Sequence, residues 1–202
     1  MSSRVWFEDR IRKIFPELLL SEGQFSLLYR HFELLSRWNE RMDLTSVDTP
    51  DEVVSRHYCE SLFFGLRAPR NGVNLSVIDF GSGAGFPGVP LAVLHPEWQV
   101  TLLEANQRRA VFLKEATREL PNVRVVAERG ERFDQRHDCI VARAVNVPEV
   151  LRSVPRLADT IGLLVSEGAV EGLSKAVNLR WTQSVRIPWS ETRCCVFGEC
   201  ST

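Results

Sequence analysis

The sequence has no long apolar run, few lysines and almost no net charge. No stretch of its 202 residues approaches the ~18 consecutive apolar residues that a membrane-spanning helix needs, and its N-terminus lacks the apolar segment of a signal peptide. Only three of its 25 basic residues are lysines, and the formal net charge is −1, so charge alone does not indicate a nucleic-acid binder. We therefore expect a cytoplasmic protein that is not anchored in a membrane.

The cysteines lack the spacing of a metal site. There are five of them, an odd number, and none forms a C-x-x-C pair. Cys194 and Cys195 are adjacent, which is poor geometry for two ligands of a tetrahedral zinc ion. We expect reduced thiols, several of them filling strand positions, and no metal ion. With 44% hydrophobic residues, the chain can form one substantial core with a small appendage.

The first third of the chain is predicted to be helical. Apolar side chains recur every three or four residues between Phe25 and Trp38, which places one buried stripe on a helix. A second helix is expected over Pro50–Leu66, because Thr49 can cap it and a proline suits the first turn. We therefore predict an N-terminal helical extension, residues 1–67, packed on a second domain, residues 68–202.

Beyond that boundary, short apolar segments alternate with helical periodicity. This alternation is typical of βαβ units, in which a largely parallel sheet is covered by helices on both faces. We predict an α/β fold of Rossmann-like type. The expected strands are 75–80, 99–103, 123–127, 139–142 and 161–166, followed by a terminal pair, 184–188 and 193–198. The expected helices between them are 87–94, 107–120 and 148–157.

The stretch Val77–Gly88 carries the most informative motif. The first strand is expected to end at Phe80, and Gly81, Gly83 and Gly85 follow it directly. Glycines at this position let the backbone turn sharply and approach a ligand closely. The helix that comes next would point its N-terminal amides at the same loop. The sequence therefore predicts a ligand-binding loop at the end of the first strand.

Three nucleotide-binding patterns compete for this loop. The dinucleotide fingerprint G-x-G-x-x-G occurs at residues 83–88, but it begins two residues too late, since it should open immediately after the strand. A triphosphate-binding loop is excluded because no Gly-Lys-Ser/Thr follows. An acidic residue before G-x-G-x-G, as Asp79 before residues 81–85, is the pattern of S-adenosylmethionine-dependent methyltransferases. A carboxylate there can hold the loop or face the positively charged methionine part of the cofactor.

Polar residues at three further strand ends support an adenosyl site. Glu104 follows the second strand, where a carboxylate can accept both ribose hydroxyls of an adenosine. The run Glu128-Arg129-Gly130-Glu131 follows the third strand and places polar groups near the expected position of the adenine edge. Arg143 ends the fourth strand, in the crevice where α/β sheets bind ligands. Together these residues favour an S-adenosylmethionine site over a structural loop.

Several longer motifs carry a resemblance to a known family. They are Trp38-Asn39-x4-Leu44-Thr45-Ser46, Arg56-His57-x2-Glu60-Ser61-Leu62 and the run from Asp79 to Leu91, with shorter ones as far as Glu191-x-Arg193. On these motifs the chain resembles the GidB/RsmG family over essentially its full length. Members of that family are bacterial class I methyltransferases that modify N7 of a guanine in 16S ribosomal RNA.

The resemblance implies a cofactor, S-adenosyl-L-methionine, and a set of residues that bind it. The glycine loop would contact its methionine and adenosine parts, the carboxylate after the second strand its ribose, and the pair after the third strand its adenine. The implied cofactor-binding residues are Asp79, Gly81, Gly83, Phe86, Glu104, Gly130, Glu131 and Arg143.

The resemblance also implies a substrate and two catalytic residues. Arg143 would lie beside the cofactor and the incoming base, and Arg129 would face the RNA. Guanine N7 carries an exposed lone pair, so transfer to it needs positioning rather than a general base. The implied partner is 16S rRNA or the small ribosomal subunit, and we expect a monomer. Glu167 stands where the family usually carries a lysine.

Two alternatives remain open at this point. One is a methyltransferase of the same fold that acts on a small molecule or a protein, which the near-neutral charge and Glu167 would suit. The other is a non-catalytic relative that binds only an adenosyl compound or RNA.

Overall fold

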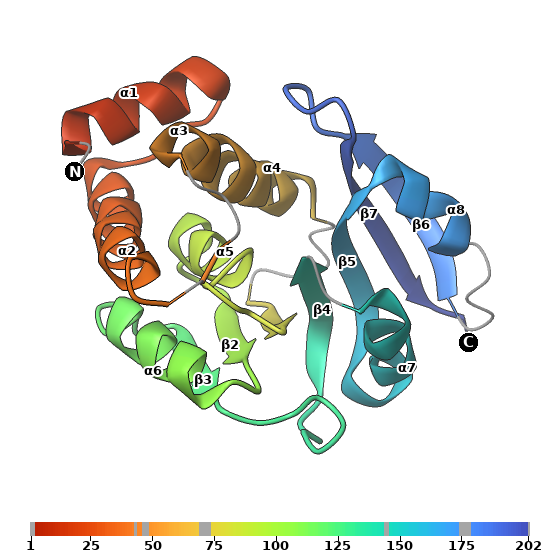
Figure 1. The fold of residues 1–202 in the computed structure, drawn as a ribbon. Coiled ribbons are helices and arrows are strands. Elements are labelled where there is room, and N and C mark those ends of the chain that lie inside the picture. Colours follow the sequence, from red (N-terminus) through yellow and green to blue (C-terminus); the bar gives the residue numbers. More distant parts are fainter. Residues whose placement is uncertain are drawn as a thin grey trace.

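The N-terminal helices form a layer against one face of a central sheet (Figure 1). The computed structural model describes residues 3–42, 44–45, 49–68, 74–143, 146–173 and 179–201. The helical layer contains α1 (Arg4–Ile14), α2 (Glu22–Asn39), α3 (Pro50–Glu52), the π-helical segment η1 (Val53–Cys59) and α4 (Glu60–Arg67). Both predicted helical stretches are present. The second is continuous from α3 through the π-helical η1 to α4. The predicted domain boundary is followed by residues 69–73, which lie outside the described residues.

Local sequence signals explain where α2 begins and which side it buries. Ser21 and Gln24 form a capping box, in which each side chain accepts a hydrogen bond from the other residue's backbone amide, at 3.2 and 2.9 Å. Gln24 Nε2 also donates to the carbonyl oxygen of Val93, 2.9 Å away, and so joins α2 to the next layer. The buried side of the helix comprises Phe25, Leu28, His31, Phe32 and Leu35. The predicted stripe is therefore correct, with a histidine inserted in it.

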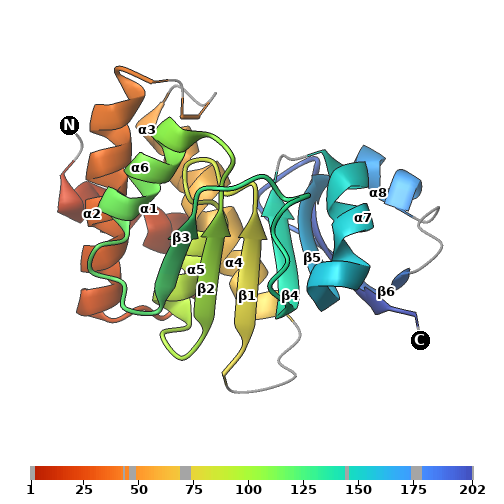
Figure 2. The same ribbon diagram turned by 90° about the horizontal axis from the view of Figure 1, so that it is seen from below.

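The sheet has seven strands in the order β3-β2-β1-β4-β5-β7-β6. The first five strands in that order are mutually parallel, whereas β7 runs antiparallel to both β5 and β6. Figure 2 shows the arrowheads of β1, β2, β3 and β4 pointing the same way. The strands are β1 (Ser76–Phe80), β2 (Gln99–Leu103), β3 (Val123–Val126), β4 (His137–Arg143), β5 (Ala158–Ser166), β6 (Leu179–Arg186) and β7 (Arg193–Cys200). The helices of this part are α5 (Gly88–Leu94), α6 (Gln107–Ala116), α7 (Val147–Leu157) and α8 (Glu167–Leu173).

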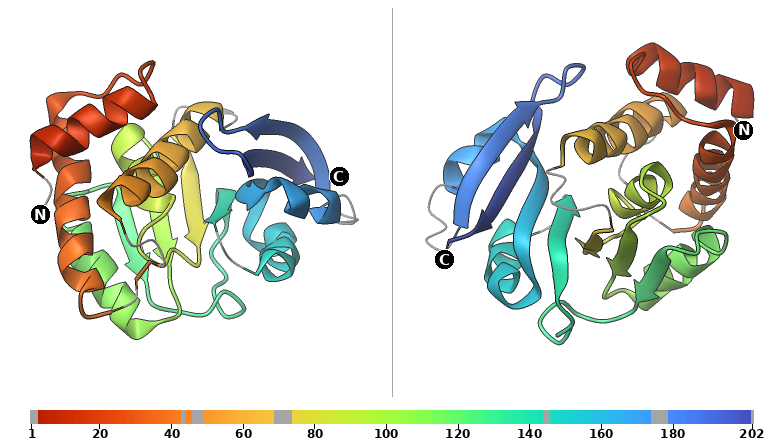
Figure 3. Two further views of the ribbon diagram at one scale, coloured as in Figure 1. Left: turned by 45° about the horizontal axis from the view of Figure 1, so that its top comes forward. Right: turned by 180° about the vertical axis from the view of Figure 1, so that it is seen from behind.

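Alternate residues of the parallel strands enter two separate cores. In β1, Val77 belongs to the core shared with α1, α2, α4 and α5, while Ile78 belongs to the core shared with α7 and α8. Val141 and Ile140 divide in the same way in β4. This two-residue period follows from the pleat of a strand. The β6–β7 pair lies at the end of the sheet away from α2, as both views in Figure 3 show.

Some boundaries differ from the sequence-based ones. β6 begins at Leu179 rather than at residue 184, and α8 was not expected at all. β6 is one of the two edge strands of the sheet. It is mostly exposed, and its sequence accordingly shows little apolar alternation. α6 ends at Ala116, and the backbone of its C-cap residue Thr117, with φ −109° and ψ 11°, has left the helical conformation.

Two further expectations concern composition. The cysteines of β4 and β7, which are Cys139, Cys194, Cys195 and Cys200, occupy strand positions as predicted. Within the described ranges, no helix is long and apolar enough to cross a membrane.

Candidate active site

The glycine loop bends over the end of strand β2. The amides of Gly81 and Ser82 both donate to the carbonyl oxygen of Leu103, at 2.9 and 3.0 Å. Gly81, Gly83 and Gly85 all have positive φ, at 72°, 56° and 90°. L-residues with a side chain rarely adopt this conformation, which explains the G-x-G-x-G spacing. Among the described residues, a Cβ atom on Gly83 would meet only the carbonyl oxygen of Gly81, 3.9 Å away, so the loop presents bare backbone there.

Asp79 supports this loop from behind. Its side chain is fully buried, and Oδ2 accepts a hydrogen bond of 3.0 Å from the amide of Gly88, where α5 begins. A Cβ atom on Gly88 would come within 2.6 Å of the same oxygen, so only glycine permits this approach. Burial raises the pKa of Asp79 to about 7, against the opposing effect of the Gly88 hydrogen bond. Among the described residues, Oδ1 has no hydrogen-bond partner.

Glu104 holds the loop from the neighbouring strand. One carboxylate oxygen, Oε2, accepts from the amide of Gly83 at 2.8 Å, and the other, Oε1, accepts from the amide of Asn106 at 2.7 Å. Asn106 in turn caps α6 through its side chain. Each carboxylate oxygen can accept a second hydrogen bond. Glu104 therefore fixes the loop and retains the capacity to bind a hydroxyl group.

A cavity of about 330 Å³ lies where β1, β2 and β3 end. Five predicted site residues line it: Gly81, Glu104, Arg129, Gly130 and Glu131. The other lining residues are Phe80, Leu103, Ala105, Arg109, Glu128, Asn146 and Glu149, of which only Glu128 belongs to the polar run expected after the third strand. Glu149 could have been found from its place in the first turn of α7. The described residues of the wall include four glutamates against two arginines, a balance that favours a cationic ligand.

Gly130 forms the floor of the cavity by close approach. A Cβ atom at this position would overlap the ring of Phe80. The carbonyl oxygen of Gly130 accepts from Arg156 Nη2 at 2.8 Å, and the same guanidinium also donates to the carbonyl oxygen of Phe133. A glycine is needed here to bring backbone against an aromatic ring, which is a packing requirement that the sequence did not reveal.

The structure does not bring Phe86 to this cavity. The chain turns at Gly85, and the ring of Phe86 is buried beneath the loop among the helices. It stacks on His57 with a centroid distance of 4.8 Å and meets Tyr58 edge to face at 5.0 Å. Its contact with the loop is thus from the side opposite the open space, and the described lining of the cavity does not include it.

Arg143 lies at the predicted strand end but turns toward the helical layer. Its side chain is 10% exposed, Nη1 donates to His57 Nδ1, and Nη2 lies 3.4 Å from Glu60 Oε2. Arg193 Nε lies 3.5 Å from the same Glu60 oxygen. Burial lowers the pKa of Arg143 to about 10. Burial, with Arg143 adding to it, also holds the pKa of His57 far below its usual range, so the imidazole is neutral.

Glu167 is paired rather than free. Its two carboxylate oxygens accept from Arg186 Nε and Nη2, at 2.5 and 2.7 Å, in a fork-like pair across the β6 edge. This pairing lowers the pKa of Glu167. The charge at this strand end is therefore balanced within the protein, which the sequence did not indicate.

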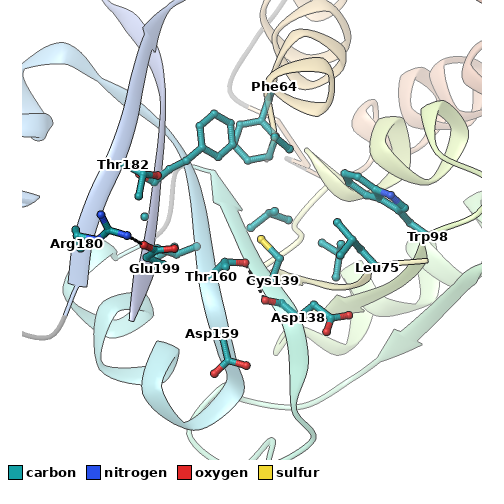
Figure 4. Close-up of a pocket in the computed structure, with 16 residues that line it drawn as sticks. Phe64, Leu75, Trp98, Asp138, Cys139, Asp159, Thr160, Arg180, Thr182 and Glu199 are labelled. Carbon is teal, nitrogen blue, oxygen red and sulfur yellow. Dashed lines mark hydrogen bonds and ion pairs between the residues drawn. The ribbon is translucent and has the colours of Figure 1, made fainter. Parts of the chain in front are cut away.

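A second cavity lies at the opposite ends of the strands, near the amino ends of β1, β4 and β5. Its volume is about 460 Å³, and Figure 4 shows Phe64 and Trp98 on its wall with the Arg180–Glu199 pair at its rim. Among the described residues that line it, none belongs to the predicted site. The carboxyl-end cavity is therefore the candidate active site.

Comparison with known proteins identifies the family of the chain. The model of the GidB family, rRNA small subunit methyltransferase G, matches residues 24–168. A protein named ribosomal RNA small subunit methyltransferase G from Nitrosomonas europaea is 40% identical over 149 residues, 71% of this chain and 68% of the relative. One named ribosomal RNA small subunit methyltransferase G 1, from Syntrophobacter fumaroxidans, is 35% identical over 187 residues, 87% of this chain and 83% of the relative.

The solved structures give the fold independently. A crystal structure of a SAM-dependent methyltransferase from Aquifex aeolicus is similar with a TM-score of 0.58, covering 79% of this chain and 97% of that one, at 15% identity. That likeness supports the predicted class I methyltransferase architecture. The family match over most of the chain and the 35–40% identities confirm the predicted membership: the chain belongs to the GidB family, rRNA small subunit methyltransferase G, and is an S-adenosylmethionine-dependent methyltransferase.

Proposed function

We propose that the chain transfers a methyl group from S-adenosylmethionine to N7 of a guanine in 16S ribosomal RNA, either free or within the small ribosomal subunit. The observation that carries the proposal is the meeting of three strand ends around one acidic cavity, where Gly81, Glu104, Gly130 and Glu131 come together. The names of the related proteins support ribosomal RNA of the small subunit as the acceptor.

The residues present fit the cofactor. S-adenosylmethionine supplies a methyl group on a sulfonium, which is already an activated electrophile. The glutamates of the cavity wall suit its positive charge, and the backbone of Gly83 together with the cavity-lining Gly81 suits close approach. Glu104 would accept the ribose hydroxyls, while Gly130 and Glu131 would lie along the adenine. Asp79 would hold the loop in place.

Phe86 enters the proposal as a support beneath the loop. Its ring is packed between the loop and His57. In this position it would fix the backbone that contacts the cofactor.

Methyl transfer to guanine N7 mainly requires that the protein orients the base and the cofactor. Guanine N7 already carries the attacking lone pair, so no residue has to remove a proton before transfer. Arg129 lies at the cavity rim and would bind the RNA, where a guanidinium can contact phosphate. Arg143 would stand beside the base, held in one orientation by Glu60 and His57. Positioning of this kind can supply a large part of the acceleration.

The paired state of Glu167 removes the main argument for another acceptor. An unpaired glutamate at this strand end would repel RNA, but its carboxylate is engaged by Arg186. Because its proposed acceptor is ribosomal, we propose that the protein acts in the cytoplasm, and as a monomer.

The test is methyl transfer from labelled S-adenosylmethionine to small subunits that lack the modification. Chemical cleavage at N7-methylguanine then locates the label within the RNA. A Glu104→Ala variant should lose the signal, whereas Glu199→Gln, at the opposite edge of the sheet, should retain it. Cofactor binding without labelled RNA would refute the acceptor and leave the cofactor site standing.

A further inference from the structure

A buried histidine of the helical layer contacts the glycine loop. His31 lies on α2 and is 1% exposed. Its Nε2 atom is 3.0 Å from the carbonyl oxygen of Ala84, inside the G-x-G-x-G segment. Its Nδ1 atom is 2.6 Å from the hydroxyl of Tyr58, on η1. Residues far apart in the sequence thus form one hydrogen-bonded chain that ends on the loop.

The acceptor at the end of this chain fixes the direction of each hydrogen bond. A carbonyl oxygen can only accept, so the proton of the neutral imidazole resides on Nε2. Nδ1 is then an acceptor, and the hydroxyl of Tyr58 donates to it. Burial lowers the pKa of His31 to about 4, which keeps the ring neutral near pH 7. Tyr58 therefore stabilises the tautomer of His31 that holds Ala84, by donating to Nδ1.

The packing around the loop shows that His31 also supports its shape. A Cβ atom on Gly85 would lie 3.1 Å from His31 Nε2, so the turn rests directly against the imidazole. The ring of Phe86 meets that of His31 edge to face, 5.3 Å between centroids. From the sheet side, Glu104 holds the amide of Gly83. The loop is thus held between a carboxylate of the sheet layer and an imidazole of the helical layer.

We propose that His31 and Tyr58 are a positioning pair for the glycine loop, through which α2 and η1 take part in S-adenosylmethionine binding. The proposal rests on the proposed use of this loop by the cofactor. Neither residue touches the cavity. They act by raising the fraction of molecules whose glycine loop has the conformation that binds S-adenosylmethionine. When that fraction falls, the apparent dissociation constant rises in inverse proportion.

The decisive variant removes the donor. His31→Leu leaves the buried carbonyl of Ala84 without its partner in the present loop shape, which favours other shapes. We expect the dissociation constant for S-adenosylmethionine, measured by titration calorimetry, to rise about tenfold. His31→Gln retains an N–H near the position of Nε2 and should restore binding to within about threefold of the unchanged protein.

His95 offers a matched control. It is also a buried histidine, with Nε2 3.1 Å from the carbonyl oxygen of Gly65, and it stacks on Trp98 away from the glycine loop. His95→Leu makes the same change in the same kind of environment and should leave cofactor affinity unchanged. If the His31 and His95 variants weaken binding equally, the effect is general destabilisation and the proposal fails.

Tyr58→Phe gives a second test that removes only one hydroxyl. Imidazole ¹⁵N shifts should report the Nε2-protonated tautomer of His31 in the unchanged protein, and in this variant the Nδ1 resonance should move because that nitrogen has lost its donor. Its cofactor affinity should fall about threefold. This variant carries the test if His31→Leu does not fold, as judged by thermal unfolding.

The outcomes separate this inference from the proposed function. An unchanged protein that does not bind S-adenosylmethionine contradicts the proposed function itself. An unchanged protein that binds it, together with folded His31 and Tyr58 variants of the same affinity, overturns the positioning pair alone.

Discussion

The carboxylate of Glu104 accepts a hydrogen bond from the amide of Gly83, across 2.8 Å, so the end of β2 holds the loop that follows β1. The second oxygen of the same carboxylate holds Asn106, which caps α6. The side chain of Glu104 thus sets the position of both the glycine loop and α6. This relationship explains why a carboxylate is needed at the second strand end even before any ribose binds.

Glu104→Gln should weaken S-adenosylmethionine binding. A glutamine amide has one acceptor oxygen, and its NH₂ group would face one of the two backbone amides that the carboxylate now accepts from. A buried donor left without a partner costs about 1–3 kcal/mol, so we expect a rise in the dissociation constant of about tenfold. Calorimetric titration measures it, and Glu119→Gln, in a surface pair with Arg30, is the control. Equal affinity in the two variants would show that Glu104 plays no part.

Asp79 should make stability depend on pH. Its folded pKa of about 7 lies above the ordinary value of 3.8, because burial disfavours the charged form. The stability that the neutral carboxyl contributes is complete below pH 4 and is lost as the pH rises toward 7, by at most about 1.4 kcal/mol per pH unit.

Asp79→Asn removes this dependence while its amide oxygen can still accept from Gly88. The difference in free energy of unfolding, variant minus unchanged protein, should grow in favour of the variant between pH 4 and pH 7. Taking the difference cancels the contribution of His31, whose lowered pKa acts in the opposite sense over this range. Denaturant unfolding at several pH values measures it, and two parallel profiles would contradict the raised pKa.

Gly130→Ala should destabilise the protein. The added methyl group would overlap the ring of Phe80, and overpacking of this kind costs about 1–3 kcal/mol. Thermal or denaturant unfolding measures the loss. Gly168→Ala in α8 is the control, since a methyl group there meets none of the described residues within 4 Å and a helical alanine is favoured over glycine by about 1 kcal/mol. A neutral Gly130→Ala would mean that the floor of the cavity is adaptable.

Glu167→Lys should strengthen RNA binding and increase its salt dependence. The change replaces the partner of Arg186 by a second cation and so leaves two positive charges beside each other at the β5 end. Each additional phosphate contact releases counterions, so the slope of log affinity against log salt should steepen by about one per contact. Glu199→Lys breaks a corresponding pair with Arg180, at the other end of strands β6 and β7, and serves as the control. Identical slopes for both variants would exclude a specific RNA contact near residue 167.

The sequence by itself determined the features that depend on residues close together in the chain. The positive φ angles at Gly81, Gly83 and Gly85 follow from glycine spacing, and the strand-end position of Glu104 follows from the apolar segment before it. The alternation of strands and helices, and the family, could likewise be predicted. Each of these depends on backbone preference or on the two-residue and 3.6-residue periods of burial, which are local properties.

Only the tertiary structure decided which distant side chains meet. It placed Phe86 beneath the loop instead of in the cavity, turned Arg143 toward Glu60, and paired Glu167 with Arg186. It also brought His31 to the carbonyl of Ala84. These contacts join the helical layer, the loop and the edge strands, so they depend on how the layers pack on the sheet. No spacing along the chain records that packing, since the same local pattern is compatible with several partners across the interface.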